Sequence, residues 1–297
     1  MQAGSPPVMA YVVMALGATG LTLGDFFIKK SSLAGVSLPA LMVFSWPFTV
    51  AALLVLAHLK GGIRHHLYPH APGRLLIRAV LLLVMATLNI TSLMMNPYAQ
   101  HAMLFQLSPV FALLISVLVL GERLSAHVIV VLVTCLAGTW LILDPGFQGI
   151  SATLLIAVAA ALSNAVTNTF VAVNRTAATP LGFTFWAVNG VSLVIVPWWL
   201  LADRSVPALN AQMFIQLSAG FAVLGIILAS LAMQLARGNI GRISIMLYVQ
   251  MPVALGLGWL ALGEYPPQSA ILGGILIGLA GASVPLMGRR HRERAPT

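Results

Sequence analysis

Charged residues are scarce in this chain. Only 7% of its 297 residues are charged and six are acidic, whereas a soluble protein of this length carries about 25% charged residues. Sixty per cent of the residues are hydrophobic, and the mean hydropathy is +0.99. A single cysteine, Cys135, excludes a disulfide within the chain and lies in an apolar segment, where we expect it to pack. The composition therefore excludes a soluble globular protein and predicts an integral membrane protein.

The motifs of known membrane enzymes are also missing. No His is followed by Glu, so the His-Glu-x-x-His motif of metalloproteases is absent, and so is the Gly-x-Ser-x-Gly motif of serine hydrolases. Proteolysis by two aspartates would need a second acid beside Asp25 within an apolar segment. A histidine cluster at 58–70 has no Cys or acidic partner that would suggest a metal site. We therefore expect no enzyme activity, cofactor or metal, with an intramembrane enzyme or a channel-like pore as the alternatives.

Apolar runs of about 20 residues recur along the whole sequence, each long enough to cross a bilayer core of ~30 Å. They predict an all-α integral membrane protein with ten transmembrane helices. These helices are predicted at residues 8–28, 37–58, 75–95, 99–120, 126–143, 150–172, 181–201, 212–235, 242–262 and 268–287.

The net charge of +9 is distributed unevenly between the predicted loops. With the N-terminus inside, twelve of the 15 Lys and Arg residues fall on the cytoplasmic side, and only Lys29, Lys30 and Arg204 fall outside. This bias follows the positive-inside rule and predicts a protein of the cell (inner) membrane with both termini in the cytoplasm. The basic residues thus indicate topology and contact with membrane lipid, and we expect no nucleic-acid partner.

A pattern in the first half of the chain returns about 143 residues later. Ser108-Pro109-Val110 corresponds to Met251-Pro252-Val253, Leu120-Gly121-Glu122 to Leu262-Gly263-Glu264, and Leu136-Ala137-Gly138 to Leu279-Ala280-Gly281. A polar loop at 144–149 separates two halves, 1–146 and 147–297, each with five predicted helices. Because five is odd, the halves insert in opposite orientations. The sequence therefore predicts two inverted five-helix repeats, an arrangement suited to alternating access.

These motifs resemble a known family. A polar-Phe-x-x-x-Lys element (Asp25-Phe26 to Lys30) and Pro-x(11 or 12)-Gly-Glu in the fourth and ninth helices are similar to the EamA-type branch of the drug/metabolite transporter superfamily. The resemblance implies a secondary active transporter for a small polar or amphipathic metabolite, such as an amino acid or a drug, that is coupled to protons or works by exchange. It leaves open import or export, and monomer or homodimer. Many members place an amide where this chain has Asp25.

Asp25 is the one acidic residue inside a predicted span. A charge in hydrocarbon costs about 2.5–3.5 kcal/mol or more, so its side chain should face protein or a watery cavity. It can titrate with a proton, bind a cationic substrate group, or pair with Lys29 four residues later. Burial favours the protonated acid and a nearby Lys30 favours the carboxylate, so the sequence leaves its charge open.

Other polar and aromatic side chains inside the spans are candidate substrate ligands. Gln106 and Gln250 lie just before Pro109 and Pro252, where proline weakens the helix and frees backbone groups. We predict a substrate site that includes Asp25, Lys30, Asn89, Gln106, Asn164, Asn168, Trp186, Tyr248 and Gln250. The alternatives are hydrogen bonds between helices for the amides, and extension of both Lys29 and Lys30 to the headgroups. Glu122 and Glu264 are expected to cap the helices that follow them.

Overall fold

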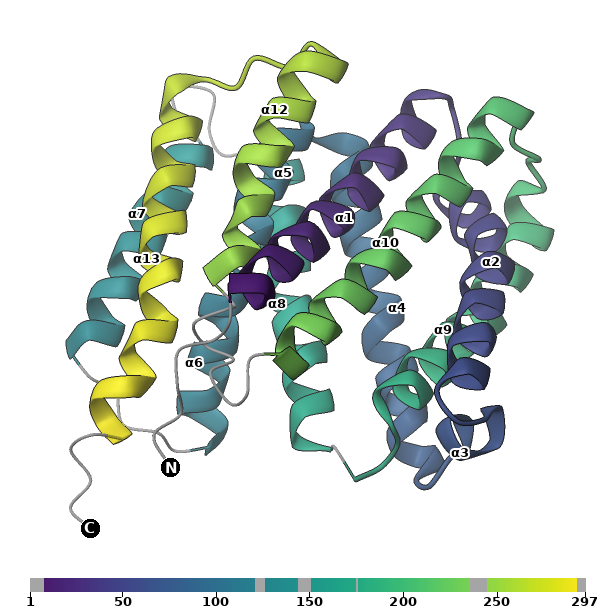
Figure 1. Cartoon of the computed structure of the whole chain (residues 1–297). Coiled ribbons are helices and arrows are strands. Elements are labelled where there is room, and N and C mark those ends of the chain that lie inside the picture. The colour runs from purple at the N-terminus through teal and green to yellow at the C-terminus, as the bar shows by residue number, and fades with distance from the viewer. Residues whose placement is uncertain (1–7, 121–125, 144–150, 175, 236–244, 293–297) are drawn as a thin grey trace.

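The protein is a bundle of helices. A computed structural model describes residues 8–120, 126–143, 151–174, 176–235 and 245–292, and every regular element in these ranges is helical (Figure 1). This confirms the predicted all-α class. Six segments are long and apolar enough to cross a membrane: α1 (Val8–Leu33), α2 (Leu38–Leu59), α4 (Pro72–Met95), α8 (Ala152–Val173), α9 with η1 (Pro180–Asp203) and α10 (Leu209–Leu235).

The remaining predicted spans correspond to other helices. The fifth and tenth match α7 (Ala126–Leu143) and α13 (Gln268–Arg292). The fourth and ninth are each broken, the fourth into α5 (Tyr98–Phe105) and α6 (Ser108–Leu120), and the ninth into the 3-10 helix η2 (Ile245–Val249) and α12 (Gln250–Leu262). Each break comes just before a proline. Proline lacks an N–H and clashes with the preceding turn, so the α-helix restarts with the proline in its first turn.

Two smaller elements lie between the long helices. A short helix, α3 (Ile63–Leu67), follows α2, and the π-helix η1 (Trp199–Asp203) ends α9. Ser37 caps the start of α2, and its hydroxyl also donates to the carboxylate of Asp203 at the end of η1.

Helices α1 and α10 lie side by side through the middle of the bundle (Figure 1). Their contact depends on glycine. A Cβ on Gly225 of α10 would lie 2.7 Å from the Leu21 nitrogen and 2.8 Å from the Gly17 oxygen of α1. Lipid tails are as apolar as side chains, so helices in a membrane associate through close backbone packing, which small residues allow.

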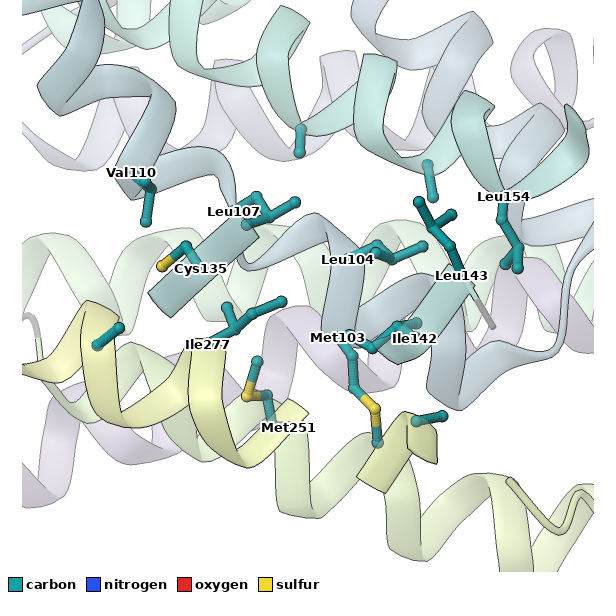
Figure 2. Close-up of a cluster of buried hydrophobic side chains, with 14 of the residues drawn as sticks. Met103, Leu104, Leu107, Val110, Cys135, Ile142, Leu143, Leu154, Met251 and Ile277 are labelled. Carbon is teal, nitrogen blue, oxygen red and sulfur yellow. The ribbon is translucent and has the colours of Figure 1, made fainter. Parts of the chain in front are cut away.

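A second close contact joins α7 and α13. A Cβ on Gly138 would lie 2.7 Å from the Gly273 oxygen, and the reverse substitution would be closer still. Around this contact α5, α6, α7, α8, α12 and α13 share one apolar core (Figure 2). Figure 2 shows the sulfur atoms of Cys135, Met103 and Met251 inside it, so Cys135 packs as predicted.

We predict that Gly225→Ala destabilises the protein, because the added methyl group must push α1 and α10 apart. Overpacking of this kind costs typically about 1–3 kcal/mol. Gly256→Ala in α12 is the matched control, because a Cβ there meets nothing within 4 Å. Its thermal unfolding in detergent should equal that of the wild type or occur at a slightly higher temperature. Equal melting temperatures for the two variants would contradict this account of the α1–α10 contact.

Candidate functional site

The two broken helices meet through a pair of glutamines. Gln106 is the C-cap of α5, and Gln250 is the first residue of α12. The Gln106 Nε2 atom donates to the Leu247 carbonyl at 3.1 Å and to the Gln250 Oε1 at 3.3 Å. Tyr248 of η2 packs against the apolar core, and its buried hydroxyl has no hydrogen-bond partner in the described part of the chain. The structure thus brings two of the predicted ligands, Gln106 and Gln250, together where both helices are interrupted.

A chain of amides continues from this point onto α8. Ser108, which opens α6, accepts a hydrogen bond at 2.9 Å from the Nδ2 of Asn164. Asn168, one turn along α8, donates to the Asn164 Oδ1 at 3.2 Å. Asn164 is partly buried and Asn168 is exposed. These contacts connect the break between α5 and α6 to an accessible polar group.

Asp25 lies opposite Asn89. The two side chains, on α1 and α4, are hydrogen-bond partners, and the buried Asn89 Oδ1 has no partner among the described residues. Since Oδ1 is unpaired, the Nδ2 group is the donor to the carboxylate. Tyr98 of α5 fixes this part of α1, because its hydroxyl donates to the Thr22 carbonyl at 2.6 Å. Asp25 forms no ion pair with Lys29 among the described residues, because Lys29 turns elsewhere.

The two lysines at the end of α1 behave differently. Lys29 is only 6% exposed, and its Nζ donates to the Asn96 carbonyl at 2.7 Å. Extension of Lys29 to the headgroups is therefore wrong; the C-cap carbonyl of α4 supplies an acceptor inside the protein. Lys30 is less buried. Its Nζ lies 5.7 Å from the centre of the Phe26 ring and donates to the Ala261 carbonyl of α12 at 3.3 Å.

Four buried polar side chains and the partly buried Glu264 surround the start of α5. We name them the α5 cluster: Lys29, Ser92, Asn96, His101 and Glu264. The Asn96 Nδ2 donates to Ser92 and to the Thr153 carbonyl, and the His101 Nδ1 contacts the Ser92 hydroxyl at 2.9 Å. The other ring nitrogen of His101, Nε2, is buried without a partner in the described residues. Sequence reasoning missed this cluster, because no spacing rule joins residues from α1, α4, α5 and a later loop.

Glu264 caps α5 and not the helix that follows it. Its Oε2 accepts from the Tyr98 nitrogen at 2.6 Å and from the Ala99 nitrogen at 3.3 Å. The expected capping of α13 is therefore wrong. Gly263 ends α12 in the left-handed region, with φ 66°, and its turn brings the carboxylate to the N–H groups that open α5. The corresponding Glu122 lies outside the described residues.

Trp186, another predicted ligand, forms its hydrogen bond with a different part of the bundle. Its Nε1 donates to the Leu67 carbonyl of α3 at 2.8 Å. A different tryptophan, Trp46 of α2, donates to the Asn189 Oδ1 of α9 at 3.4 Å, a pair that the sequence did not suggest. Beside Trp46 is a mainly apolar cavity of about 210 Å³ between α2, α4 and α9, and none of the predicted ligands lines it.

We predict a pH-dependent difference between the wild type and Glu264→Gln. Burial raises the pKa of Glu264, although the Ala99 and Tyr98 N–H groups and Lys29 act in the opposite direction. A carboxyl group whose pKa is higher in the folded than in the unfolded state stabilises the fold at pH values below its unfolded-state pKa. It loses that contribution as the pH rises through its folded-state pKa. The stability of the wild type relative to Glu264→Gln, from thermal melts in detergent, should therefore fall between pH 4 and pH 7. A constant difference, or an increasing one, would contradict the prediction.

Comparisons with known proteins agree with this architecture. A solved crystal structure superposes with a TM-score of 0.64 over 96% of this chain and 99% of its own, at 18% sequence identity, which shows a shared fold. The pseudopaline exporter CntI of Pseudomonas aeruginosa (strain UCBPP-PA14) is 26% identical over 254 residues, which cover 83% of this chain and 86% of the exporter. Residues 8–144 match the EamA-like transporter family. The first half of the chain is therefore similar to the EamA-like transporter family, and most of the chain is similar to an exporter.

Proposed function

We propose that this protein is a secondary transporter that moves a small polar or amphipathic metabolite by alternating access between two inverted halves, 1–146 and 147–297. The observation that carries the proposal is a relation between two hydrogen bonds. Trp46 and Asn189 are 143 residues apart, and Gln106 and Gln250 are 144 apart. These separations equal, within one residue, the offset of the repeated sequence landmarks.

A two-fold axis explains this coincidence. Residues related by such an axis touch each other only where they lie on it. The Trp46–Asn189 contact joins α2 to α9, and the Gln106–Gln250 contact joins α5 to α12. Two such points on different helix pairs support one axis that exchanges the halves, the geometry of inverted-repeat transporters.

The helix contacts support the same relation. The two-fold relation would make α1, α2 and α4 correspond to α8, α9 and α10. The α1–α10 contact then corresponds to the α4–α8 contact, and the α2–α10 contact to the α4–α9 contact; all four contacts occur. The α1–α10 and α4–α8 contacts differ in detail. Gly24 of α1 packs against the α10 backbone, whereas Thr167, 143 residues later, reaches the Leu81 carbonyl with its hydroxyl at 3.4 Å. In an inverted-repeat transporter, corresponding contacts must pack unequally whenever the protein is open to one side of the membrane only.

The named relative supports export as the direction, since it is described as a pseudopaline exporter. The site supports a substrate with hydrogen-bonding groups, because amides from α5, α8 and α12 meet at the helix breaks. We place the protein in the cell (inner) membrane with both termini in the cytoplasm, on the distribution of its basic residues.

We predict that Gln106→Ala and Gln250→Ala each lower transport in proteoliposomes by about tenfold or more, because either change removes a ligand at the axis. Gln212→Ala is the matched control. Its side chain donates to the Pro207 carbonyl near the start of α10, away from the breaks. The assay is uptake of labelled amino acids, nucleosides, cationic drugs and vitamins, with equal amounts of folded protein. Normal transport by both variants would remove the glutamine pair from the site.

We further propose that the Asp25–Asn89 pair couples transport to protons. An ionised Asp25 accepts from the amide of Asn89, and a protonated Asp25 can donate to the amide oxygen after the amide rotates. The unpaired Asn89 Oδ1 supplies that second acceptor. The pair can therefore satisfy both protonation states within the bundle, as a proton carrier must.

Asp25→Asn should abolish substrate accumulation driven by a pH gradient, because the amide keeps the shape and cannot titrate. Exchange of substrate down its own gradient should persist. Asp203→Asn is the control, since Asp203 hydrogen-bonds with Ser37 and Ser205 at the end of η1. Undiminished pH-driven accumulation in Asp25→Asn would exclude coupling, and an equal loss of both modes would favour a role for Asp25 in a gate.

A further inference from the structure

Arg78 is a partly buried cation whose guanidinium has two unpaired nitrogens among the described residues. It lies in the first third of α4, and its Nε and Nη1 atoms are both buried with no hydrogen-bond partner in the described part of the chain. No ion pair to Arg78 is present among the described residues either. A guanidinium stays charged in proteins, and a buried charge without a counter-ion is strongly unfavourable.

Contact with lipid headgroups does not explain this position. An arginine that extends to the interface keeps its guanidinium in water, whereas two nitrogens of Arg78 are inaccessible. Arg74, one turn earlier on the same helix, is exposed and fits the interfacial role. The two arginines therefore differ in environment although they are only four residues apart.

Arg78 shares a face of α4 with the polar groups already described. Asn89 follows it by 11 residues and Asn96 by 18, which are about three and five helical turns. The Asn89 side of this face contacts Asp25, and the Asn96 side contacts Lys29. Arg78 thus continues the same inward-facing polar stripe toward the Pro72 end of α4, about 16 Å along the axis from Asn89.

We propose that Arg78 binds a carboxylate of the transported metabolite, at a station separate from the Asp25–Asn89 pair. The planar guanidinium can hold a carboxylate with two parallel hydrogen bonds, and the bound anion would supply the missing counter-charge. Because about three turns of α4 separate Arg78 from Asn89, we assign the two groups to separate stations that are occupied in turn. This inference rests on the proposed transport function and assigns its substrate class, an amino acid or another organic acid.

The test uses thermal unfolding of the full-length protein in detergent. Without added ligand, Arg78→Gln should melt several degrees above the wild type, because the unpaired charge is gone. Arg74→Gln, the matched control, should melt with the wild type. Succinate, citrate and L-glutamate serve as probes against sodium chloride of equal ionic strength. At least one of them should raise the melting temperature of the wild type and of Arg74→Gln, with an apparent Kd at least tenfold weaker for Arg78→Gln.

Three results would overturn the proposal: a lower melting temperature for ligand-free Arg78→Gln, equal stabilisation of wild type and Arg78→Gln by the acids, or no stabilisation by any of them. Binding is measured here without transport. Acid binding through Arg78 together with absent transport in proteoliposomes would therefore refute the transport function and keep the site. Transport without acid binding would refute the Arg78 site and keep the transport function.

Discussion

The absence of water in the bilayer core is the constraint on which this structure depends. A polar group inside a span is stabilised by a partner within the protein, on its own helix or on another, because hydrocarbon offers none. The helix breaks before Pro109 and Pro252 free backbone groups, and Gln106 binds the Leu247 carbonyl that one of them exposes. The buried ammonium of Lys29 meets the same need with the Asn96 carbonyl at the end of α4. Helix ends and helix breaks thus become the contacts that hold the bundle together.

Helix α5 is where these requirements converge. Its first turn is capped by Glu264, its Tyr98 hydroxyl binds α1, and its last residue, Gln106, reaches η2 and α12. A helix of eight residues cannot be stable alone, so it is held by these bonds. Movement of α1 against α12 must therefore change the contacts of α5. Helix α5 thus connects the Asp25–Asn89 pair with the glutamine pair.

The sequence was informative where one physical rule decides the outcome. Hydropathy gave the long helices, and proline chemistry gave the breaks beside Gln106 and Gln250. It failed where the answer depends on which helices are neighbours. Lys29 and Lys30 are indistinguishable by pattern, yet Lys29 is buried against the Asn96 carbonyl of α4 and the more exposed Lys30 reaches the Ala261 carbonyl of α12. Glu264 could cap any helix start nearby, and the turn at Gly263 selects α5. Trp186 bonds to α3, a contact that no periodicity encodes.

The proposed symmetry of the fold does not extend to its charges. At the 143-residue offset, Asp25 corresponds to Asn168, an uncharged amide, and Arg78 to Phe221, which stacks on Phe27 with ring centres 5.7 Å apart. The first half thus supplies Asp25 and Arg78, and the second half has an amide and an aromatic ring at the corresponding positions. An inverted repeat presents similar backbones to the two sides of the membrane, so backbone geometry alone gives the path no chemical direction. A substrate carboxylate would meet a cation in one half and an aromatic ring at the corresponding place in the other. Charge asymmetry on a symmetric scaffold can therefore make the two access states differ in affinity.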